Sequence, residues 1–298
     1  MAQHRGRAVA VLFGAVVFWS SVPLFLKHFT GTLDAWTVNG VRYGVAAVLL
    51  LPACIAARGR RGVSGRPIWR DALVPAAVNT LGQVGWALAP YHIDASFMGF
   101  GIRSAFFFTL LGSLWLLPEE RGLVRAPTFW AGTAVCVAGL GLLFAGSLRG
   151  RVSPLGSAIL LGTAMVWGFY SVNVRRFMRG YAAHHSFGVI CCYTAVALAV
   201  LALLFGRTSD LRAATPGTLA LLVLSAICGI ASAHVAMYYS LERLGPLLVA
   251  GGEFVTPFLT FAGAALLFGE RLSPGQWLGG CAVVAGSVVL LRTRRRVP

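Results

Sequence analysis

Charged residues are scarce in this sequence, and acidic residues are the scarcest. Only 11% of the 298 residues are charged, and nine of them are Asp or Glu, whereas a soluble domain carries about 25% charged residues. Apolar residues make up 57% of the chain, and the mean hydropathy is +0.77. Folding in water does not account for so little charge. The composition therefore indicates a protein whose solvent is a lipid bilayer.

Motifs for catalysis and for cofactors are also missing. The chain has no Gly-x-x-x-x-Gly-Lys-Ser/Thr, no His-Glu-x-x-His and no Cys-x-x-Cys, so direct use of ATP through the first motif is excluded. The one Gly-x-Ser-Gly, at 62–65, lies in an arginine-rich loop. All six cysteines fall in apolar segments, where they act as small packing residues. We expect no enzyme, no bound metal and no cofactor.

Apolar segments of spanning length are abundant. A membrane helix needs about 20 apolar residues, and the loops between these segments leave no room for a soluble domain. The first segment has no small-residue cleavage site after it, so it is expected to stay as a membrane helix. The ten predicted spans are 8–26, 35–57, 72–90, 95–117, 127–146, 154–174, 185–206, 217–239, 246–268 and 275–292.

The basic residues are distributed unevenly between the two sides of the predicted bundle. The net charge of +16 is typical of nucleic-acid binding when the charges cluster on one surface. Here 17 of the 25 basic residues fall on the side of the N-terminus and six on the other, with Arg42 and Arg103 inside spans. This asymmetry matches the positive-inside rule. It predicts that both termini are cytoplasmic and that no nucleic acid is bound.

The chain repeats itself at a nearly constant interval. The first span reads LFGAVVFW up to Trp19, and the sixth reads LLGTAMVW up to Trp167, an offset of 148 residues. Glu120-Arg121 recurs 150 residues later, and the segment from Trp130 recurs 147 residues later. Three similar offsets in the same order indicate a duplication. We predict a first five-helix repeat at 1–150 and a second at 151–298.

An odd number of spans in each half has a direct consequence for topology. The second half must enter the membrane from the opposite side, so the two repeats are inverted and related by a pseudo-two-fold axis in the membrane plane. Secondary transporters have this architecture, with the substrate bound near the midplane between the repeats. The predicted fold is therefore an all-α integral membrane protein of ten transmembrane helices in two inverted five-helix repeats.

Several of these features together resemble a known family. They are Trp19-Ser20 with Lys27 downstream, Arg42, Trp167-Gly168 followed by Arg175-Arg176, Pro257, Gly269-Glu270 and the first-half counterpart Glu120. Over its whole length the chain resembles the ten-helix drug/metabolite transporter superfamily, in its bacterial amino-acid and metabolite exporter branch. Within that branch it is most similar to the aromatic amino acid exporters of the bacterial inner membrane.

The resemblance implies export of small metabolites across the cell inner membrane, with the lipid bilayer and an amino-acid-like molecule as partners. One position departs from symmetry, because Phe107 stands in the first repeat where Pro257 stands in the second. The second repeat thus matches the family motif more closely than the first does. Gating segments in the two repeats need not move in the same way.

Three charged residues lie within predicted spans, where each costs about 2.5–3.5 kcal/mol unless it faces protein or water. At 1.5 Å per residue, Glu253 differs in depth from Arg42 and from Arg103 by only ~7–9 Å. We expect an Arg–Glu pair near the midplane, formed by Glu253 with one of the two arginines. A static pair, recognition of substrate charge and proton coupling all remain open as its role.

Polar and aromatic residues at helical spacing mark a candidate cavity. Asn79, Gln83 and Trp86 share one face of the third span, and amides beside an indole suit a neutral, partly apolar ligand. The same reasoning applied to the first, fourth, sixth and eighth spans adds Trp19, Ser104, Trp167, Tyr170, His234 and Tyr238. Packing within the bundle or contact with lipid is the alternative for these aromatic stripes. Pro23 and Pro257 are candidate kinks at which a gate bends.

The functional hypothesis that follows is a secondary transporter that exports amino acids, including aromatic and neutral ones, by alternating access. Export of cationic or lipophilic drugs, or of another metabolite, is the alternative within transporters. A passive uniporter is a third possibility, because inverted repeats occur there too. The single in-span acid, against two in-span bases, argues against a dedicated cation carrier.

Overall fold

The computed structural model describes residues 2–93, 95–145, 153–268 and 271–293. All named elements in these ranges are helices, and Arg61 and Pro67 form an isolated β-bridge. The predicted all-α fold is confirmed. The boundary between the two predicted repeats and the Gly269-Glu270 motif lie outside the described residues.

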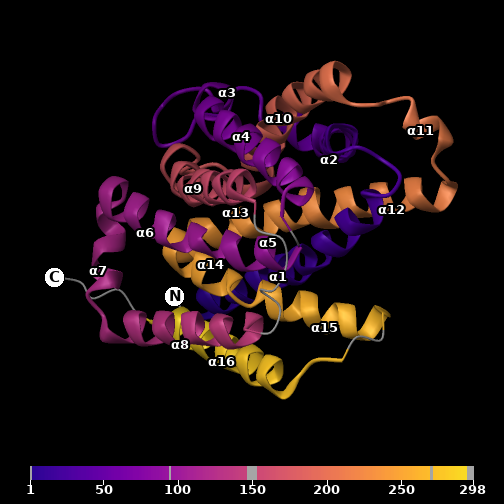
Figure 1. The fold of residues 1–298 in the computed structure, drawn as a ribbon. Coiled ribbons are helices and arrows are strands. Elements are labelled where there is room, and N and C mark those ends of the chain that lie inside the picture. Colours follow the sequence, from indigo (N-terminus) through magenta and orange to yellow (C-terminus); the bar gives the residue numbers. More distant parts are fainter. Residues whose placement is uncertain (1, 94, 146–152, 269–270, 294–298) are drawn as a thin grey trace.

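The first half supplies five spans, two of which are assembled from several elements (Figure 1). Its helices are α1 (Ala2–Phe29), α2 (Ala35–Ala56), α3 (Ile68–Asp71), α4 (Leu73–Leu88), η1 (Ala89–Tyr91), α5 (Ala95–Gly101), η2 (Ile102–Ser104), α6 (Ala105–Leu116), η3 (Pro118–Glu120), α7 (Arg121–Val124) and α8 (Pro127–Phe144).

The second half repeats this order. Its helices are α9 (Pro154–Phe177), α10 (Ala183–Phe205), α11 (Asp210–Ala213), α12 (Pro216–Ala226), η4 (Ile227–Ser232), α13 (Ala233–Leu244), α14 (Pro246–Glu253), α15 (Thr256–Phe268) and α16 (Pro274–Arg292).

Nine helical segments of the described chain are long and apolar enough to cross a membrane, and each coincides with a predicted span. The remaining predicted span, 72–90, corresponds to α4, whose 16 residues are extended by α3 before it and η1 after it. The interruptions at both ends explain why its continuous α-helix is shorter than the roughly 20 residues of a full span.

Helix starts follow local sequence signals. Asp34 caps α2 by accepting from the backbone of Trp36 and Thr37. Ser153, Thr215 and Ser273 each cap the helix that follows, with proline as its first residue. A hydroxyl or carboxylate at the cap accepts from a backbone N–H that would otherwise have no partner. A proline just inside the helix has no N–H to satisfy, and its fixed φ suits the first turn.

The two halves are related by a two-fold axis, and direct contacts mark where it passes. The Cys191 thiol lies 3.9 Å from the carbonyl oxygen of Tyr43, 148 residues earlier. Arg103 contacts Glu253, 150 residues later, and Cys136 contacts Val283, 147 residues later. These separations equal the repeat offsets in the sequence, so each residue touches its own counterpart.

Glycine contacts between α8 and α16 show that this axis is perpendicular to the helices. A Cβ at Gly132 would lie 2.9 Å from the Gly286 carbonyl oxygen, and one at Gly139 would lie 2.8 Å from that of Gly279. By the 147-residue offset, Gly132 corresponds to Gly279 and Gly139 to Gly286. A rotation about the two-fold axis therefore converts each of these two contacts into the other. The two helices run antiparallel and lie side by side (Figure 1). The inverted five-helix repeats are confirmed.

Both termini lie at the same end of the bundle. Arg5 Nη2 donates to the carbonyl oxygens of Leu291 and Thr293, at 2.7 and 2.6 Å. The start of α1 and the end of α16 are thus adjacent, and this end is called the terminal end below. The other end, where α1 finishes and α2 begins, is called the distal end.

Two corresponding spans are broken near their middle. The fourth passes from α5 to α6 through the 3₁₀ turn η2, and the ninth passes from α14 to α15 through Phe254 and Val255. Pro257 lies just after the second break, in the first turn of α15. Pro23, by contrast, lies inside a continuous α1. A break in helical backbone at membrane depth is tolerated where it lines a cavity or is buried in protein.

Candidate functional site

A large cavity lies between the two repeats. Its volume is about 460 Å³, within the range of about 300–1,000 Å³ typical of small-molecule sites. The lining comes from α1, α2, α4, α5, η2, α6, α9, η4, α13, α14 and α15, with one contribution from the end of α8. Both broken spans border it.

Most of the residues singled out in the sequence meet in this cavity. Helical spacing brings them together because each pattern marks the face of a helix that turns away from lipid. The residues that line it are Trp19, Pro23, Arg42, Asn79, Gln83, Trp86, Arg103, Trp167, Tyr170, His234, Glu253 and Pro257.

Two candidates, Ser104 and Tyr238, do not belong to the lining. The Ser104 hydroxyl donates to the carbonyl oxygen of Gly101 at 2.7 Å, within its own helical turn. Tyr238 is 3% exposed and lies behind Tyr170, with 2.5 Å between the two hydroxyl oxygens. Tyr238 therefore supports the cavity wall through its contact with Tyr170. The Ser104 hydroxyl serves as a hydrogen-bond donor to a carbonyl of its own helical turn.

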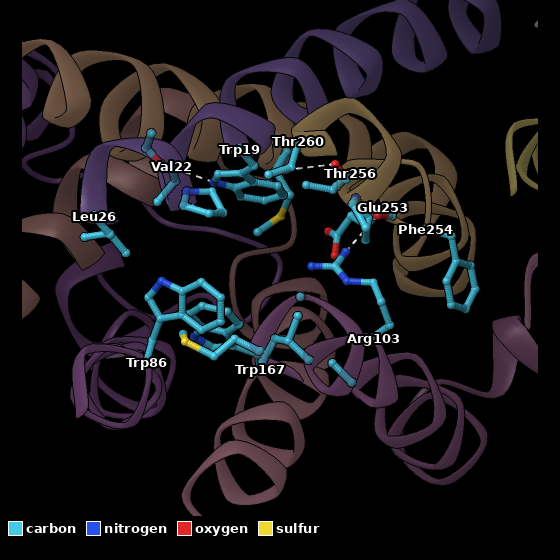
Figure 2. A pocket seen from close by; sticks show the side chains of 18 of the residues that line it. Trp19, Val22, Leu26, Trp86, Arg103, Trp167, Glu253, Phe254, Thr256 and Thr260 are labelled. Atoms are coloured by element: carbon cyan, nitrogen blue, oxygen red, sulfur yellow. Dashed lines mark hydrogen bonds between the residues drawn. The ribbon is translucent and has the colours of Figure 1, made fainter. Parts of the chain in front are cut away.

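Aromatic rings form two walls of the cavity. The rings of Trp86 and Trp167 are 5.1 Å apart, and across from them lies Trp19 (Figure 2). The Trp19 ring meets the edge of His234 at 5.3 Å, and His234 stacks on Phe187 at 4.6 Å. Such rings give large apolar contact area with few rotatable bonds, which suits a flat or aromatic ligand.

The polar stripe of α4 is only partly free for a ligand. Asn79 is fully buried, and its Nδ2 lies 3.1 Å from the hydroxyls of Tyr43 and Thr194, while its Oδ1 has no partner. The Gln83 backbone carbonyl accepts from the Asn39 amide at 3.0 Å. Asn79 thus ties α4 to α2 and α10 and leaves one amide atom for a bound molecule.

Of the two arginines, Arg103 is the one beside Glu253. Its Nη1 donates to the backbone carbonyl oxygen of Glu253 at 2.7 Å, and the carboxylate lies close enough to interact with its charge (Figure 2). The contact joins η2 to the end of α14, which are the points where the fourth and ninth spans are interrupted. The predicted Arg–Glu contact is present, but its hydrogen bond uses the main chain of Glu253.

Several lining residues were not predicted from the sequence. Thr109, Thr256 and Thr260 bring hydroxyls, and Phe144 and Phe261 bring rings. The Thr260 hydroxyl donates to the Ser20 carbonyl oxygen at 2.9 Å, so it links α15 to α1. Threonine and phenylalanine are common in membrane helices of any orientation, so no sequence signal set these apart.

The cavity is closed toward the terminal end. Its lining from α1 begins at Trp19 and ends at Leu26, and Thr30 follows just after the helix, so only the distal half of α1 takes part. On the terminal side of the cavity, the hydroxyls of Tyr170 and Tyr238 form a hydrogen bond. Closer to the terminal end, Arg175 donates to the backbone carbonyl oxygen of Glu242. The cavity therefore extends toward the distal end.

Loops seal the terminal end further. The Tyr181 hydroxyl lies 2.8 Å from the Arg66 carbonyl oxygen and 3.0 Å from Asp71 Oδ2, which also accepts from Ser64. Burial raises the pKa of Tyr181, so its hydroxyl keeps its proton at neutral pH. A Cβ at Gly62 would lie 2.5 Å from the Tyr181 ring. The loop after α2 and the loop before α10 are thus held together.

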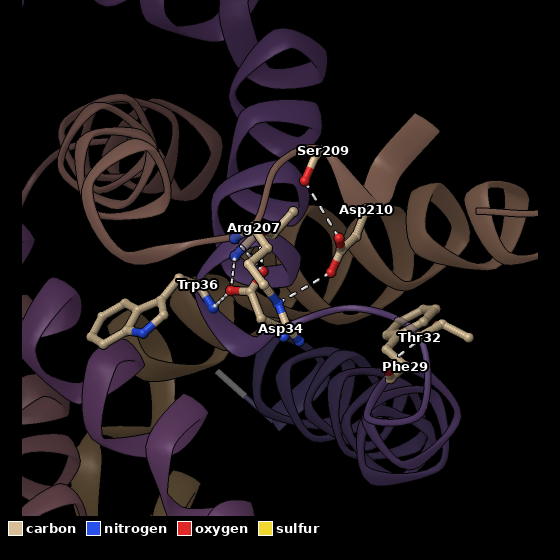
Figure 3. Close-up of polar contacts among 8 residues, drawn as sticks. Phe29, Thr32, Asp34, Trp36, Arg207, Ser209 and Asp210 are labelled. Atoms are coloured by element: carbon tan, nitrogen blue, oxygen red, sulfur yellow. Dashed lines mark hydrogen bonds and ion pairs between the residues drawn. The ribbon is translucent and has the colours of Figure 1, made fainter. Parts of the chain in front are cut away.

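At the distal end, Asp34 joins the start of α2 to the loop after α10 (Figure 3). Its Oδ2 accepts from the Thr37 hydroxyl at 2.6 Å and from the Arg207 backbone at 2.8 Å. Partial burial raises the pKa of this carboxyl, but the hydrogen bonds from Thr37, Arg207 and Trp36 outweigh burial and hold its pKa below 3.8. Asp34 is therefore ionised at neutral pH.

Metal-binding clusters are not found in the part of the chain that the structure describes, since no three His, Cys, Asp or Glu side chains gather there. The arrangement offers aromatic walls, a few hydroxyl and amide groups, and two arginines in a cavity between inverted repeats.

Comparison with known proteins agrees with this architecture. A family model described as the EamA-like transporter family matches the chain twice, at residues 6–145 and 154–292. No curated protein matches, but 29 chains among solved structures do. One, described only as the crystal structure of a protein, superposes with a TM-score of 0.77 at 20% identity, covering 95% of this chain and 96% of that chain. At this identity the likeness shows the fold alone.

Proposed function

Because the chain belongs to the EamA-like transporter family, we propose that it is a secondary transporter that exports amino acids, including aromatic and other neutral ones, by alternating access. The observation that carries the proposal is the aromatic-walled cavity between the inverted repeats, open toward one end and sealed at the other. A cavity of about 460 Å³ accommodates one amino acid with some water.

The orientation of the protein in the membrane follows from where the charges lie, whereas export as the direction of transport rests on the family resemblance. With most basic residues at the terminal end, the positive-inside rule favours a cytoplasmic location for both termini. In this orientation the conformation described above faces outward, in the bacterial inner membrane, and the loop contacts of Tyr181 close its cytoplasmic side. Single cysteines at Gly59 and Thr208, in a cysteine-free background, test the topology. Impermeant maleimide added outside intact cells is expected to label position 208 and not position 59.

Counterflow in proteoliposomes tests the activity. Vesicles loaded with unlabelled L-phenylalanine or L-tryptophan are expected to accumulate the labelled amino acid transiently, because a carrier exchanges substrate across the membrane. The Trp86→Ala variant removes one of the two rings of the Trp86–Trp167 wall and should lose most of this uptake. Trp115→Ala is the matched control, because Trp115 is 73% exposed on the outer surface of the bundle.

The outcomes separate the competing functions. Uptake without stimulation by internal substrate would indicate an open pore, whereas stimulated uptake that no ion gradient drives would indicate a passive uniporter. If the full set of amino acids fails to move while a cationic dye does, the substrate class is a lipophilic cation instead. In both cases, loss of activity in Trp86→Ala but not in Trp115→Ala would still locate the pathway in this cavity.

A further inference from the structure

Arg42 is buried about a third of the way along α2 without a compensating partner. Its side chain is 1% exposed, yet it lines the central cavity. Neither Nε nor Nη2 has a hydrogen-bond partner. Buried arginines in membranes are ordinarily paired with an acid or with backbone carbonyls, because an isolated charge there is costly. An unpaired guanidinium at a cavity wall therefore requires an explanation.

No carboxylate in the described part of the chain pairs with Arg42. The in-span acid, Glu253, lies beside Arg103. The ion pairs found in the described ranges all lie at helix ends or in loops: Arg175 and Arg179 with Glu119, Arg207 with Asp210, and Arg243 with Glu242.

The backbone beside Arg42 does not satisfy it either. Here the span formed by α12 and α13 widens into the π-helix η4, and a Cβ at Gly229 would lie 3.1 Å from Arg42 Nη2. The Gly229 carbonyl oxygen accepts from Trp19 Nε1 at 3.2 Å, and that of Ile230 lies 3.0 Å from His234 Nδ1. Trp19 and His234 thus take the carbonyls that the widened turn offers. Wide turns of this kind often occur at functional sites.

We propose that Arg42 binds the carboxylate of the transported molecule. A carboxylate can accept two parallel hydrogen bonds from one guanidinium, a strong and geometrically selective contact. It would supply the missing partner of Arg42 and offset the cost of its burial. The apolar part of the same ligand would then lie against the ring of Trp19, which stands at the same turn. This assignment rests on the proposed function and specifies which part of the substrate is recognised.

Binding of four probes to the purified protein in nanodiscs tests the assignment. L-phenylalanine and 3-phenylpropanoate carry a carboxylate, while L-phenylalaninamide and phenethylamine do not. The wild type should bind L-phenylalanine roughly 10- to 100-fold more tightly than its amide, as expected for charged hydrogen bonds. Arg42→Gln should bind the two with equal affinity, and Arg42→Lys should keep part of the preference. Arg58→Gln, in an exposed loop, is the matched control and should behave as the wild type.

Each other result has a definite meaning. A folded Arg42→Gln protein that keeps the full preference for L-phenylalanine would overturn the assignment, as would a wild type that binds neither carboxylate. If Arg42→Gln does not fold, Arg42→Lys decides, because equal weakening of all four probes would contradict a carboxylate contact. If 3-phenylpropanoate binds through Arg42 and no amino acid binds, the assignment stands and the proposed amino-acid substrate is wrong.

Discussion

The Cys136 thiol lies 3.6 Å from the carbonyl oxygen of Val283, the residue that occupies its own place in the other repeat. Both residues sit at the centre of their helices, α8 and α16, between the glycine contacts described above. The helix pair is thus held by backbone-to-backbone approach around the two-fold axis, which is how small residues stabilise helix association in lipid.

Gly139→Ala should weaken this helix pair. Its new methyl group would meet the Gly279 carbonyl oxygen at 2.8 Å, and overpacking of this kind costs about 1–3 kcal/mol. We expect a lower thermal unfolding midpoint in detergent. Gly141→Ala is the control, two residues away on the same helix, because no atom lies within 4 Å of its added Cβ. Equal midpoints for the two variants would contradict the close crossing.

Arg103 and Glu253 should differ in their effect on the fold. The hydrogen bond between them ends on the Glu253 backbone, so Glu253→Gln keeps it, whereas Arg103→Met removes it. We expect Arg103→Met to lower the unfolding midpoint clearly and Glu253→Gln to change it little. A loss of stability in Glu253→Gln as large as that in Arg103→Met would show that the carboxylate holds the two helix breaks together.

Tyr181→Phe should loosen the seal at the terminal end. The change removes the hydroxyl contacts with Arg66 and Asp71, worth about 1–2 kcal/mol together. A cysteine at the cavity residue Ser171 should therefore react roughly 5- to 30-fold faster with a reagent supplied from the terminal side. Tyr91→Phe, on an exposed tyrosine at the distal end, is the control. Unchanged reactivity in Tyr181→Phe would mean that these loops do not close the pathway.

Asp34→Ala should destabilise the protein in a pH-dependent way. Loss of an N-terminal cap costs about 1 kcal/mol. The pKa of Asp34 is lower in the folded protein than its ordinary value of 3.8, so its stabilisation is complete above that pH and is lost as the pH falls through the folded-state pKa. The difference between wild type and Asp34→Ala in thermal midpoint should persist at pH 5 and shrink only below 3.8. A difference that vanished already near pH 6 would be inconsistent with this cap.

Arg42→Met should stabilise the empty protein. The substitution replaces an unpaired buried charge with an apolar side chain of similar length, and an uncompensated charge in a membrane helix costs about 2.5–3.5 kcal/mol. The thermal midpoint without ligand should rise. The rise should be absent in Arg58→Gln, whose charge is solvated. A lower thermal midpoint for Arg42→Met would indicate that the Arg42 side chain stabilises the protein through its packing contacts.

The sequence predicted the spans, the repeat and most of the cavity because these follow from local apolar length and helical spacing. It left open whether Arg42 or Arg103 meets Glu253, since depth along a span does not reveal which helices touch. It also missed the break at η2, where Arg103 lies without a proline nearby, and the π-helix around Gly229. Both depend on contacts between helices distant in sequence. Ser104 lies on the helix face that was predicted to line the cavity, but its hydroxyl donates a hydrogen bond to the Gly101 carbonyl oxygen in its own helical turn.

The contact of Arg103 with Glu253 on the two-fold axis bears on how such a chain arose. Two identical five-helix proteins paired antiparallel about this two-fold axis would place the same side chain on both sides of the axis, so arginine would meet arginine or glutamate would meet glutamate. Like charges so close in lipid repel each other strongly. An arginine facing a glutamate here requires two copies that differ in sequence at this point, as the two halves of this chain do.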